Sequence, residues 1–236
     1  MSREDGRRSD QLRPLEIAVD YLEQPLGSVL YAQGKTRVLC TASLDERIPR
    51  WLRDSGRGWL TAEYSLLPAS TGERTPREAS AGKQKGRTVE IQRLIGRALR
   101  AVTDLEALGE RTLWVDCDVL QADGGTRCAA ISGAYVAAAR ALGKAGLSRA
   151  LTDSVAAVSV GIVGSELLLD LDYEEDSGAE VDVNVVQTGA GLLVEVQATA
   201  ERAPFDRQSH DALLDLAESG IATIRAAQEA AFGAVA

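Results

Sequence analysis

Five consecutive residues, Asp123 to Arg127, have the types and spacing of a phosphate-binding turn, Asp-Gly-Gly-Thr-Arg. They follow an alternating strand pattern and precede an Ala-rich helix pattern. Gly124 and Gly125 permit a tight turn that presents backbone N–H groups, and the amino-terminal end of a helix carries partial positive charge. Thr126 adds a hydroxyl and Arg127 a cation. The Walker A spacing is absent, and a plain glycine-rich turn with Thr126 as the N-cap is the alternative.

A second cation, Arg87, lies in the segment Gly86-Arg87-Thr88 at the start of another predicted helix. Its guanidinium could donate a second planar pair of hydrogen bonds to a phosphate bound at the turn Asp123 to Arg127. The alternative is a solvent-facing arginine after a turn, and this arginine alone does not decide between the two.

Seven carboxylates lie close together in the second half of the chain: Asp170, Asp172, Glu174, Glu175, Asp176, Glu180 and Asp182. Asp176 and Asp182 are expected on two strands joined by a short turn, from which both could project onto one site. Because Mg²⁺ takes one or two carboxylates and keeps several waters, this pair could hold it. The alternative is an acidic, solvated hairpin.

The net charge of −9 argues against a general nucleic-acid-binding protein, but the charge is unevenly distributed. Residues 34–100 carry 14 basic and 7 acidic side chains, and 11 of the 14 cations are arginines. Arg74 and Arg77 lie in the long polar segment Pro68–Lys85, where they could contact a polynucleotide backbone. A disordered loop tip is the alternative. Three further arginines form a stripe at helical spacing: Arg93, Arg97 and Arg100.

Composition places the chain among soluble globular proteins. Of its 236 residues 45% are apolar and 26% charged, and no apolar run is long enough to predict a membrane span. The amino-terminal residues lack an apolar signal region and the three cysteines share no metal-type spacing, so a cytoplasmic protein with reduced thiols is expected.

The single histidine, His210, excludes zinc sites built from several histidines, and a capping or surface role is expected for it.

Hydrophobic periodicity predicts a mixed α+β fold in which strands come in runs. The predicted strands are Pro14–Leu22, a hairpin over Gly27–Leu44 that turns at Gly34–Lys35, Trp59–Leu67, Thr112–Gln121, Val155–Val163, Glu166–Tyr173, Ala179–Gln187 and Leu192–Ala200. The predicted helices are Thr88–Val102, Cys128–Ala145 and Ser209–Phe232. The first thirteen residues are expected to be charged and loosely ordered. No linker is apparent, so one domain over residues 1–236 is expected, with the phosphate site in a part at about 14–145 and the acidic site in a part at about 155–230.

Six longer stretches are distinctive when they are taken together and in this order. They are RxDGRxxDQLRP at Arg3–Pro14, GWLTAEYSLLP at Gly58–Pro68, GRTVEIQRLIGRALRAV at Gly86–Val102, VDCDVLQADGGTR at Val115–Arg127, DLDYEEDSGAEVDVNVV at Asp170–Val186, and APFDR with LLDLAESGI within Ala203–Ile221. The chain thereby resembles the bacterial ribonuclease PH family nearly from end to end. The resemblance implies a ribosomal protein S5 domain 2-like α+β fold and a homohexamer built as a trimer of dimers.

The same resemblance implies a phosphate-dependent 3′-to-5′ exoribonuclease that trims tRNA precursors, releases nucleoside diphosphates, works reversibly and also contributes to rRNA processing. It implies these residue roles: phosphate binding by Arg87, Gly125, Thr126 and Arg127; catalysis and Mg²⁺ binding by Asp176 and Asp182; and binding of tRNA precursors by Arg74 and Arg77. Inorganic phosphate is the implied co-substrate, and Asp182 is the residue expected to manage the proton of the departing 3′ oxygen.

Three positions depart from the family's pattern. Ala69 replaces a common arginine, Cys128 a common threonine and Arg202 a common glycine. Two alternatives of other classes remain. A non-catalytic ring subunit would be expected to lack Asp182 or Arg127. A small-molecule phosphate enzyme would be expected to concentrate its arginines at the phosphate site alone.

Overall fold

The computed structural model describes residues 3–233, and its first sheet has five strands. In spatial order these are β1 (Leu15–Val19), β2 (Gly27–Gln33), β3 (Thr36–Asp45), β5 (Thr112–Gln121) and β4 (Trp59–Leu66). Neighbours are antiparallel except β4 and β5, which run parallel. A parallel pair needs a crossover connection, and helices α1 (Gly86–Arg100) and α2 (Leu105–Leu108) lie within it.

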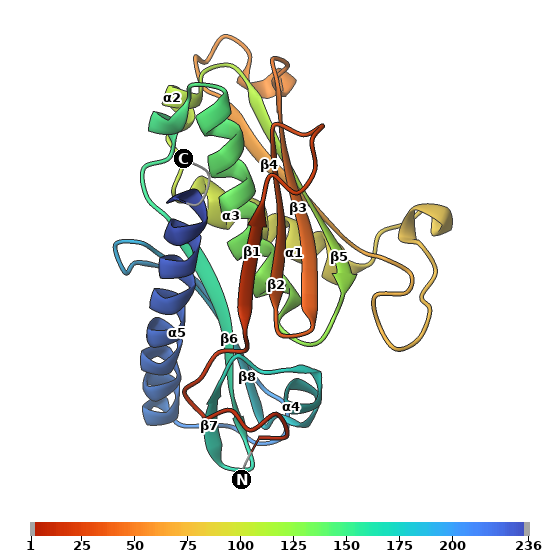
Figure 1. The fold of residues 1–236 in the computed structure, drawn as a ribbon, viewed down its shortest axis with the longest axis vertical. Coiled ribbons are helices and arrows are strands. Elements are labelled where there is room, and N and C mark those ends of the chain that lie inside the picture. The colour runs from red at the N-terminus through yellow and green to blue at the C-terminus, as the bar shows by residue number, and fades with distance from the viewer. Residues whose placement is uncertain (1–2, 234–236) are drawn as a thin grey trace.

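The second sheet has four antiparallel strands in the order β7 (Glu166–Leu169), β6 (Val155–Val163), β8 (Val181–Thr188) and β9 (Leu193–Ala200). The long helix α5 (Arg207–Gly233) packs along β6, and the short helix α4 (Tyr173–Gly178) connects β7 to β8. In Figure 1 the N-terminal segment lies beside α4 and β7 at the lower end of the molecule.

Helix α3 (Thr126–Lys144) joins the two sheets, because it packs on β2 and β3 of the first and on β6 of the second. Its alanines and glycines let these strands approach closely. At Gly133, for example, an added Cβ would lie 2.8 Å from the Sγ atom of Cys40. A helix that is buried nearly all round belongs in the centre of a core. The amino-terminal end of α3 is therefore fixed relative to both sheets.

The predicted α+β class is confirmed, and most predicted elements agree with the structure to within about two residues. The hairpin of β2 and β3 turns where expected, with Gly34 in a left-handed conformation at φ +59°.

The acidic segment after β7 differs from the prediction. The strand expected over Glu166–Tyr173 ends at Leu169, and α4 stands where a turn was expected. Asp172 and Glu175 form a capping box: the Asp172 carboxylate accepts from the Glu175 N–H at 3.0 Å, and the Glu175 carboxylate accepts from the Asp172 N–H at 3.1 Å. Asp176 consequently lies on a helix, and only Asp182 lies on a strand.

The N-terminal segment also differs from the prediction. Arg3, Arg7 and Arg13 are all less than 9% exposed, whereas a loosely ordered lead was expected. Each of the three guanidinium groups donates to a carboxylate or carbonyl of the β7–α4 segment, which lies more than 150 residues further along the chain. Buried charges need such partners, so the segment is part of the folded body.

The segment between β4 and α1 projects from the side of the body in Figure 1 and contains one 3-10 turn, Glu78–Ala81. Two further 3-10 turns lie at Arg50–Leu52 and Ser148–Ala150. Among residues 3–233, no helix combines the length and apolarity that a membrane crossing requires.

Candidate active site

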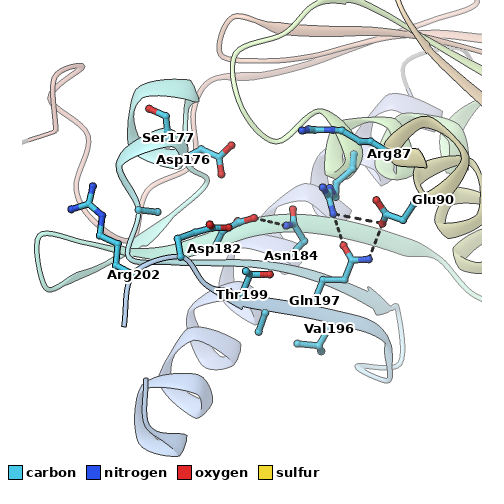
Figure 2. A pocket seen from close by; sticks show the side chains of 14 residues that line it. Arg87, Glu90, Asp176, Ser177, Asp182, Asn184, Val196, Gln197, Thr199 and Arg202 are labelled. Atoms are coloured by element: carbon cyan, nitrogen blue, oxygen red, sulfur yellow. Dashed lines mark hydrogen bonds and ion pairs between the residues drawn. The ribbon is translucent and has the colours of Figure 1, made fainter. Parts of the chain in front are cut away.

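One pocket, of about 960 Å³, lies where the amino-terminal ends of α1 and α3 face α4, β8 and β9 (Figure 2). Its lining is strongly polar: Arg87, Glu90, Arg127, Asp176, Ser177, Ala179, Asp182, Asn184, Val196, Gln197, Ala198, Thr199, Glu201 and Arg202. The pocket thus brings together two arginines and two aspartates that the sequence predicted separately.

The glycine-rich turn before α3, residues Asp123 to Arg127, is the candidate phosphate cradle. Gly124 and Gly125 have φ values of +73° and +64°, a conformation that glycine adopts readily and other residues rarely do. The Thr36 hydroxyl donates to the Gly124 carbonyl at 2.7 Å and holds the turn against β3. Gly125 is the N-cap residue and no side chain caps α3, so the interpretation of Thr126 as the N-cap is wrong. Instead, the Tyr64 hydroxyl donates to Thr126 Oγ1 at 2.9 Å.

Arg127 forms one wall of the pocket and is held there by its neighbours. Its guanidinium donates to the side-chain oxygen of Gln197 and lies 3.7 Å from the Glu90 carboxylate. The Gln197 amide in turn donates to Glu90 at 2.8 Å and to Glu195 at 2.9 Å. This network links α1, α3 and β9, so Arg127 has a defined position before any anion binds.

Arg87, in the first turn of α1, is exposed and lines the same pocket. Within residues 3–233 no hydrogen bond or ion pair occupies its guanidinium. Its charge nevertheless reaches Asp176, where burial raises the pKa and the Arg87 and Arg127 guanidiniums oppose that rise. A cation without a partner beside a polar cavity is available to an anionic ligand.

The two aspartates face each other across a poorly solvated region. Burial, together with the nearby charge of Asp176, raises the pKa of Asp182 to about 6. Arg127 and a 3.2 Å hydrogen bond donated by the Asn184 amide act in the opposite direction. Asp182 can therefore carry a proton close to neutral pH, which suits acid–base chemistry.

The same electrostatics fits a divalent cation. Two carboxylates that raise each other's cost of ionisation are stabilised by a cation between them, and Mg²⁺ accepts a set of two carboxylates completed by water. In the described part of the chain, no group of three or more His, Cys, Asp or Glu side chains could hold a metal ion. Asp176 and Asp182 form a set of two carboxylates, which is smaller than such a group.

Several residues of the site were not singled out from the sequence. Asn184 follows Asp182 by two positions on β8, and Glu90 follows Arg87 by three positions on α1, so the strand and helix periods could have indicated both. The Cys128 thiol donates to the Asn184 carbonyl oxygen at 3.3 Å and so turns the amide N–H group toward Asp182. No local pattern indicates Gln197, because β9 reaches the pocket only through tertiary packing.

The arginines of the projecting segment lie apart from this pocket. Arg74 and Arg77 are exposed and neither lines it. Arg77 instead lines a second pocket of about 450 Å³, together with Asp116 and Asp118 on the open face of β5. Burial raises the pKa of both aspartates.

The predicted basic stripe on α1 is largely neutralised by the fold. Arg97 pairs with Glu195 on β9, and Arg100 lies 4.7 Å above the Trp59 ring and donates to a backbone carbonyl of β4. His210 stacks on Phe205 at the start of α5 and does not line the pocket, which is consistent with the surface role expected for it.

Comparison with known proteins identifies the class of protein. Residues 11–142 match domain 1, and residues 153–220 match domain 2, of the 3′ exoribonuclease family. Proteins named ribonuclease PH are 58% identical over 225 residues in Bacillus subtilis (93% of this chain, 92% of theirs) and 56% identical over 243 residues in Moorella thermoacetica (100% and 96%). The chain therefore belongs to the 3′ exoribonuclease family, and its resemblance to ribonuclease PH is confirmed.

Solved structures support the fold. A chain of the Archaeoglobus fulgidus exosome, determined with RNA bound to its active site, matches with a TM-score of 0.80 at 24% identity over 95% of this chain and 91% of that chain. An archaeal exosome core chain matches with a TM-score of 0.76 at 23% identity, over 97% and 91%. The expected ribonuclease PH-like fold is confirmed.

Proposed function

We propose that this member of the 3′ exoribonuclease family shortens RNA from its 3′ end with inorganic phosphate and releases nucleoside diphosphates. The supporting observation is the single pocket that places Arg87 and Arg127, at the ends of two helices, opposite Asp176 and Asp182. In this proposal phosphate binds to the two guanidiniums, to Thr126 and to the backbone of Gly125, because a helix amino terminus and arginine forks both favour an anion.

The reaction exchanges one bond for another. An oxygen of inorganic phosphate bonds to the phosphorus of the last phosphodiester, and the bond from that phosphorus to the 3′ oxygen of the preceding nucleotide breaks. We assign to Asp182 the proton that the departing 3′ oxygen takes up; in the metal-free site the pKa of Asp182 is about 6. When bound to Asp176 and Asp182, Mg²⁺ would neutralise charge on the transferring phosphoryl group.

The same site would also run backwards. A phosphoanhydride replaces a phosphodiester, so the free-energy change of the reaction is small. Excess nucleoside diphosphate would therefore drive extension of an RNA 3′ end. Asp182 would then accept the proton of the attacking 3′ hydroxyl, as the reverse of the same step requires.

The substrates that we propose are tRNA precursors, with a further role in rRNA processing. Arg74 and Arg77 are exposed on a projecting segment, where they are available to the RNA backbone at a distance from the pocket. We also propose a homohexamer, a trimer of dimers, in the cytoplasm. Exposed tryptophans support association of subunits, since Trp51 is 67% and Trp114 40% exposed in the single chain.

The test is an assay with purified protein, Mg²⁺ and an RNA that carries extra 3′ nucleotides, with and without phosphate. Nucleoside diphosphates that appear only with phosphate support the proposal. Nucleoside monophosphates formed without phosphate would show hydrolysis instead, and no product would favour a non-catalytic subunit.

The variant Arg87→Ala sharpens this test. A hydrogen bond to a charged group is worth about 1.5–3 kcal/mol, so the KM for phosphate should rise roughly 10- to 100-fold. Arg93→Ala is the matched control, because Arg93 is an exposed arginine of the same helix that does not line the pocket. Equal effects of the two substitutions would contradict the assigned role of Arg87.

A further inference from the structure

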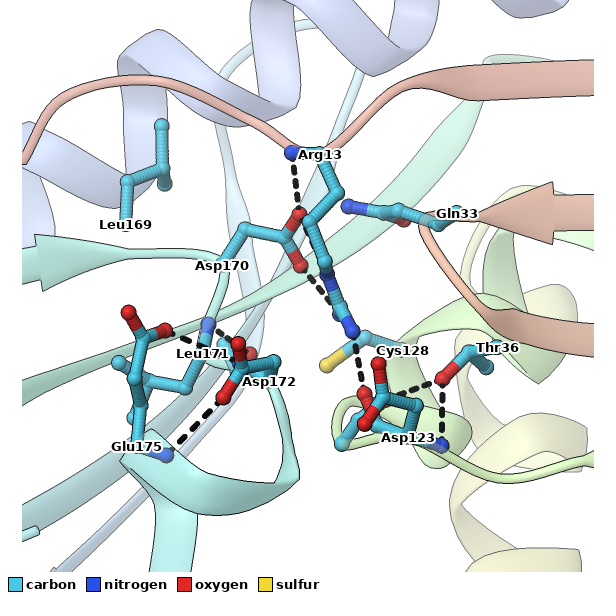
Figure 3. A network of polar contacts seen from close by, with 12 residues as sticks. Arg13, Gln33, Thr36, Asp123, Cys128, Leu169, Asp170, Leu171, Asp172 and Glu175 are labelled. Atoms are coloured by element: carbon cyan, nitrogen blue, oxygen red, sulfur yellow. Dashed lines mark hydrogen bonds and ion pairs between the residues drawn. The ribbon is translucent and has the colours of Figure 1, made fainter. Parts of the chain in front are cut away.

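The N-terminal segment, residues 3–14, contributes no side chain to the pocket, yet it contacts both halves of the site. Arg3 is 7% and Arg13 4% exposed, values that are unusual for arginine. Figure 3 shows Arg13 between Asp170, which precedes α4, and Asp123, which begins the phosphate cradle. The segment therefore lies where the acidic helix and the cradle meet.

Arg13 connects the N-terminal segment to the phosphate cradle. Its backbone N–H and its Nε atom donate to Asp170 Oδ2 at 2.8 and 3.0 Å, and its Nη2 atom donates to Oδ1 at 2.6 Å. Its remaining nitrogen, Nη1, donates to the Asp123 carbonyl. One guanidinium thus binds a buried carboxylate with one edge and the backbone of the cradle with another. A lysine could not reproduce this, because it offers no planar fork.

Arg3 connects the N-terminal segment to the acidic helix α4. Its Nε and Nη2 atoms each donate to a carboxylate oxygen of Glu175 at 2.6 Å. The same guanidinium donates to the Leu169 and Asp170 carbonyls at 2.8 and 2.9 Å. Glu175 is part of the capping box of α4 and immediately precedes Asp176, so Arg3 fixes the helical turn that carries that aspartate.

The cradle and α4 also touch directly. At Gly124 an added Cβ would lie 2.6 Å from the Asp172 carbonyl carbon and 2.6 Å from the Leu171 carbonyl oxygen. The N-cap of α4 is therefore packed on the backbone of the cradle without room for a methyl group. A displacement of the cradle would therefore shift α4, and a displacement of α4 would shift the cradle. Arg3 and Arg13 stabilise this contact without lining the pocket.

We propose that Arg3 and Arg13 are positioning residues that fix the phosphate cradle and Asp176 of α4 in their relative positions. Packing of the N-terminal segment against both of them therefore completes the active site. This inference rests on the phosphorolytic function proposed above. It assigns a mechanistic role to a segment that lines no part of the pocket. Both arginines act through other groups: Arg13 through Asp170 and the Asp123 carbonyl, and Arg3 through Glu175.

The kinetic test uses the full chain with Arg13→Lys and Arg3→Gln. At a temperature well below the melting temperature of each variant, we expect the KM for phosphate to rise at least 5-fold with Arg13→Lys, because the cradle loses its support. With Arg3→Gln we expect kcat to fall at least 5-fold with a smaller change in that KM, because Asp176 is displaced. In addition, the effects of Arg3→Gln and Glu175→Gln on kcat should be less than additive when the two are combined, since both substitutions remove the ion pair between Arg3 and Glu175.

Arg140→Gln is the matched control. Arg140 is a partly buried arginine of α3 that pairs with Asp20 at the end of β1, and it does not line the pocket. This variant should lower the melting temperature and leave both kinetic constants unchanged. If Arg13→Lys and Arg3→Gln behave like Arg140→Gln, the arginines have only a structural role and the proposal is overturned.

A measurement on the unmodified protein keeps the proposal testable if the variants fold poorly. Coupling between two sites is reciprocal, so inorganic phosphate should slow amide hydrogen exchange in residues 3–14 and in α4 as well as in the cradle. Protection confined to the cradle and the first turns of α1 and α3 would overturn the proposal. A wild-type protein that binds phosphate with the wider protection but makes no diphosphates would refute the proposed reaction and leave this coupling intact.

Discussion

Asp182→Asn should inactivate the protein and stabilise its fold. Burial and the charge of Asp176 raise the pKa of Asp182 from the ordinary 3.8 to about 6. Between these pH values the folded chain binds more protons than the unfolded chain, so the free energy of unfolding falls as the pH rises. Above pH 6 the full cost of ionising a buried carboxylate is present. Asparagine has nearly the same shape and removes this cost.

The size of the effect follows from the pKa shift. About two pKa units at about 1.36 kcal/mol each give an upper limit near 3 kcal/mol. Asp182 is partly exposed and solvent screens its interactions, so we expect about half of this, near 1.5 kcal/mol. For a chain of this length the melting temperature at pH 7.5 should then rise by about 3–6 °C.

The assay compares melting temperatures of both proteins by calorimetry, with a chelator present, at pH 7.5 and pH 4.5. At pH 4.5 Asp182 is largely protonated in the folded chain, so the gain should shrink to about a third. Asp206→Asn is the matched control, and we expect it to change the melting temperature in the opposite direction. Hydrogen bonds from Ser209 lower the pKa of this exposed carboxylate, so the substitution should lower the melting temperature at pH 7.5.

Two outcomes would refute this reasoning. One is a melting temperature of Asp182→Asn at pH 7.5 that is equal to or below that of the wild type. The other is a gain of the same size at both pH values, because an effect of shape alone would not depend on ionisation.

Three further predictions concern the cradle and the RNA path. Gly124→Ala should destabilise the fold by about 2 kcal/mol or more in chemical denaturation, because its Cβ would meet the backbone of Leu171 and Asp172, just before α4, at 2.6 Å. Gly72→Ala meets nothing within 4 Å and should be nearly neutral. Replacing Arg74 and Arg77 together by Ala should reduce the slope of log K against log salt for single-stranded RNA by about 1.4, and an unchanged slope would exclude backbone contacts. Arg202→Ala should raise the KM for RNA several-fold and leave the KM for phosphate unchanged, because Arg202 lines the pocket on the side of α4 and β9; a change confined to phosphate would be the contrary result.

Local patterns were sufficient for most of the fold. The alternation in β5 and the helical spacing of Ile91, Leu94 and Ile95 in α1 each reflect one buried face, and that face is visible within a window of about ten residues. In the acidic segment the predicted strand and turn are wrong, because β7 ends at Leu169 and α4 follows. Its capping box, Asp172 with Glu175, was visible in the sequence as the spacing of an N-terminal helix signal.

The buried state of the N-terminal arginines could not be predicted in the same way. Three arginines among acidic and polar residues are typical of a solvated N-terminal segment, and the carboxylates and carbonyls of the β7–α4 segment that bind them lie more than 150 residues away. A buried guanidinium is recognisable only when the carboxylate and carbonyl oxygens that satisfy it are in place.

The sequence by itself determined the α+β class, the glycine-rich turn at Asp123 to Arg127 before a helix and the residue types of the candidate chemistry, because each of these depends on neighbouring residues. Only the tertiary structure decided that Arg87, Arg127, Asp176 and Asp182 share one pocket, and that burial and the charge of Asp176 raise the pKa of Asp182. Electrostatic effects depend on distance and solvent exposure, and these are set where segments far apart in the chain pack together.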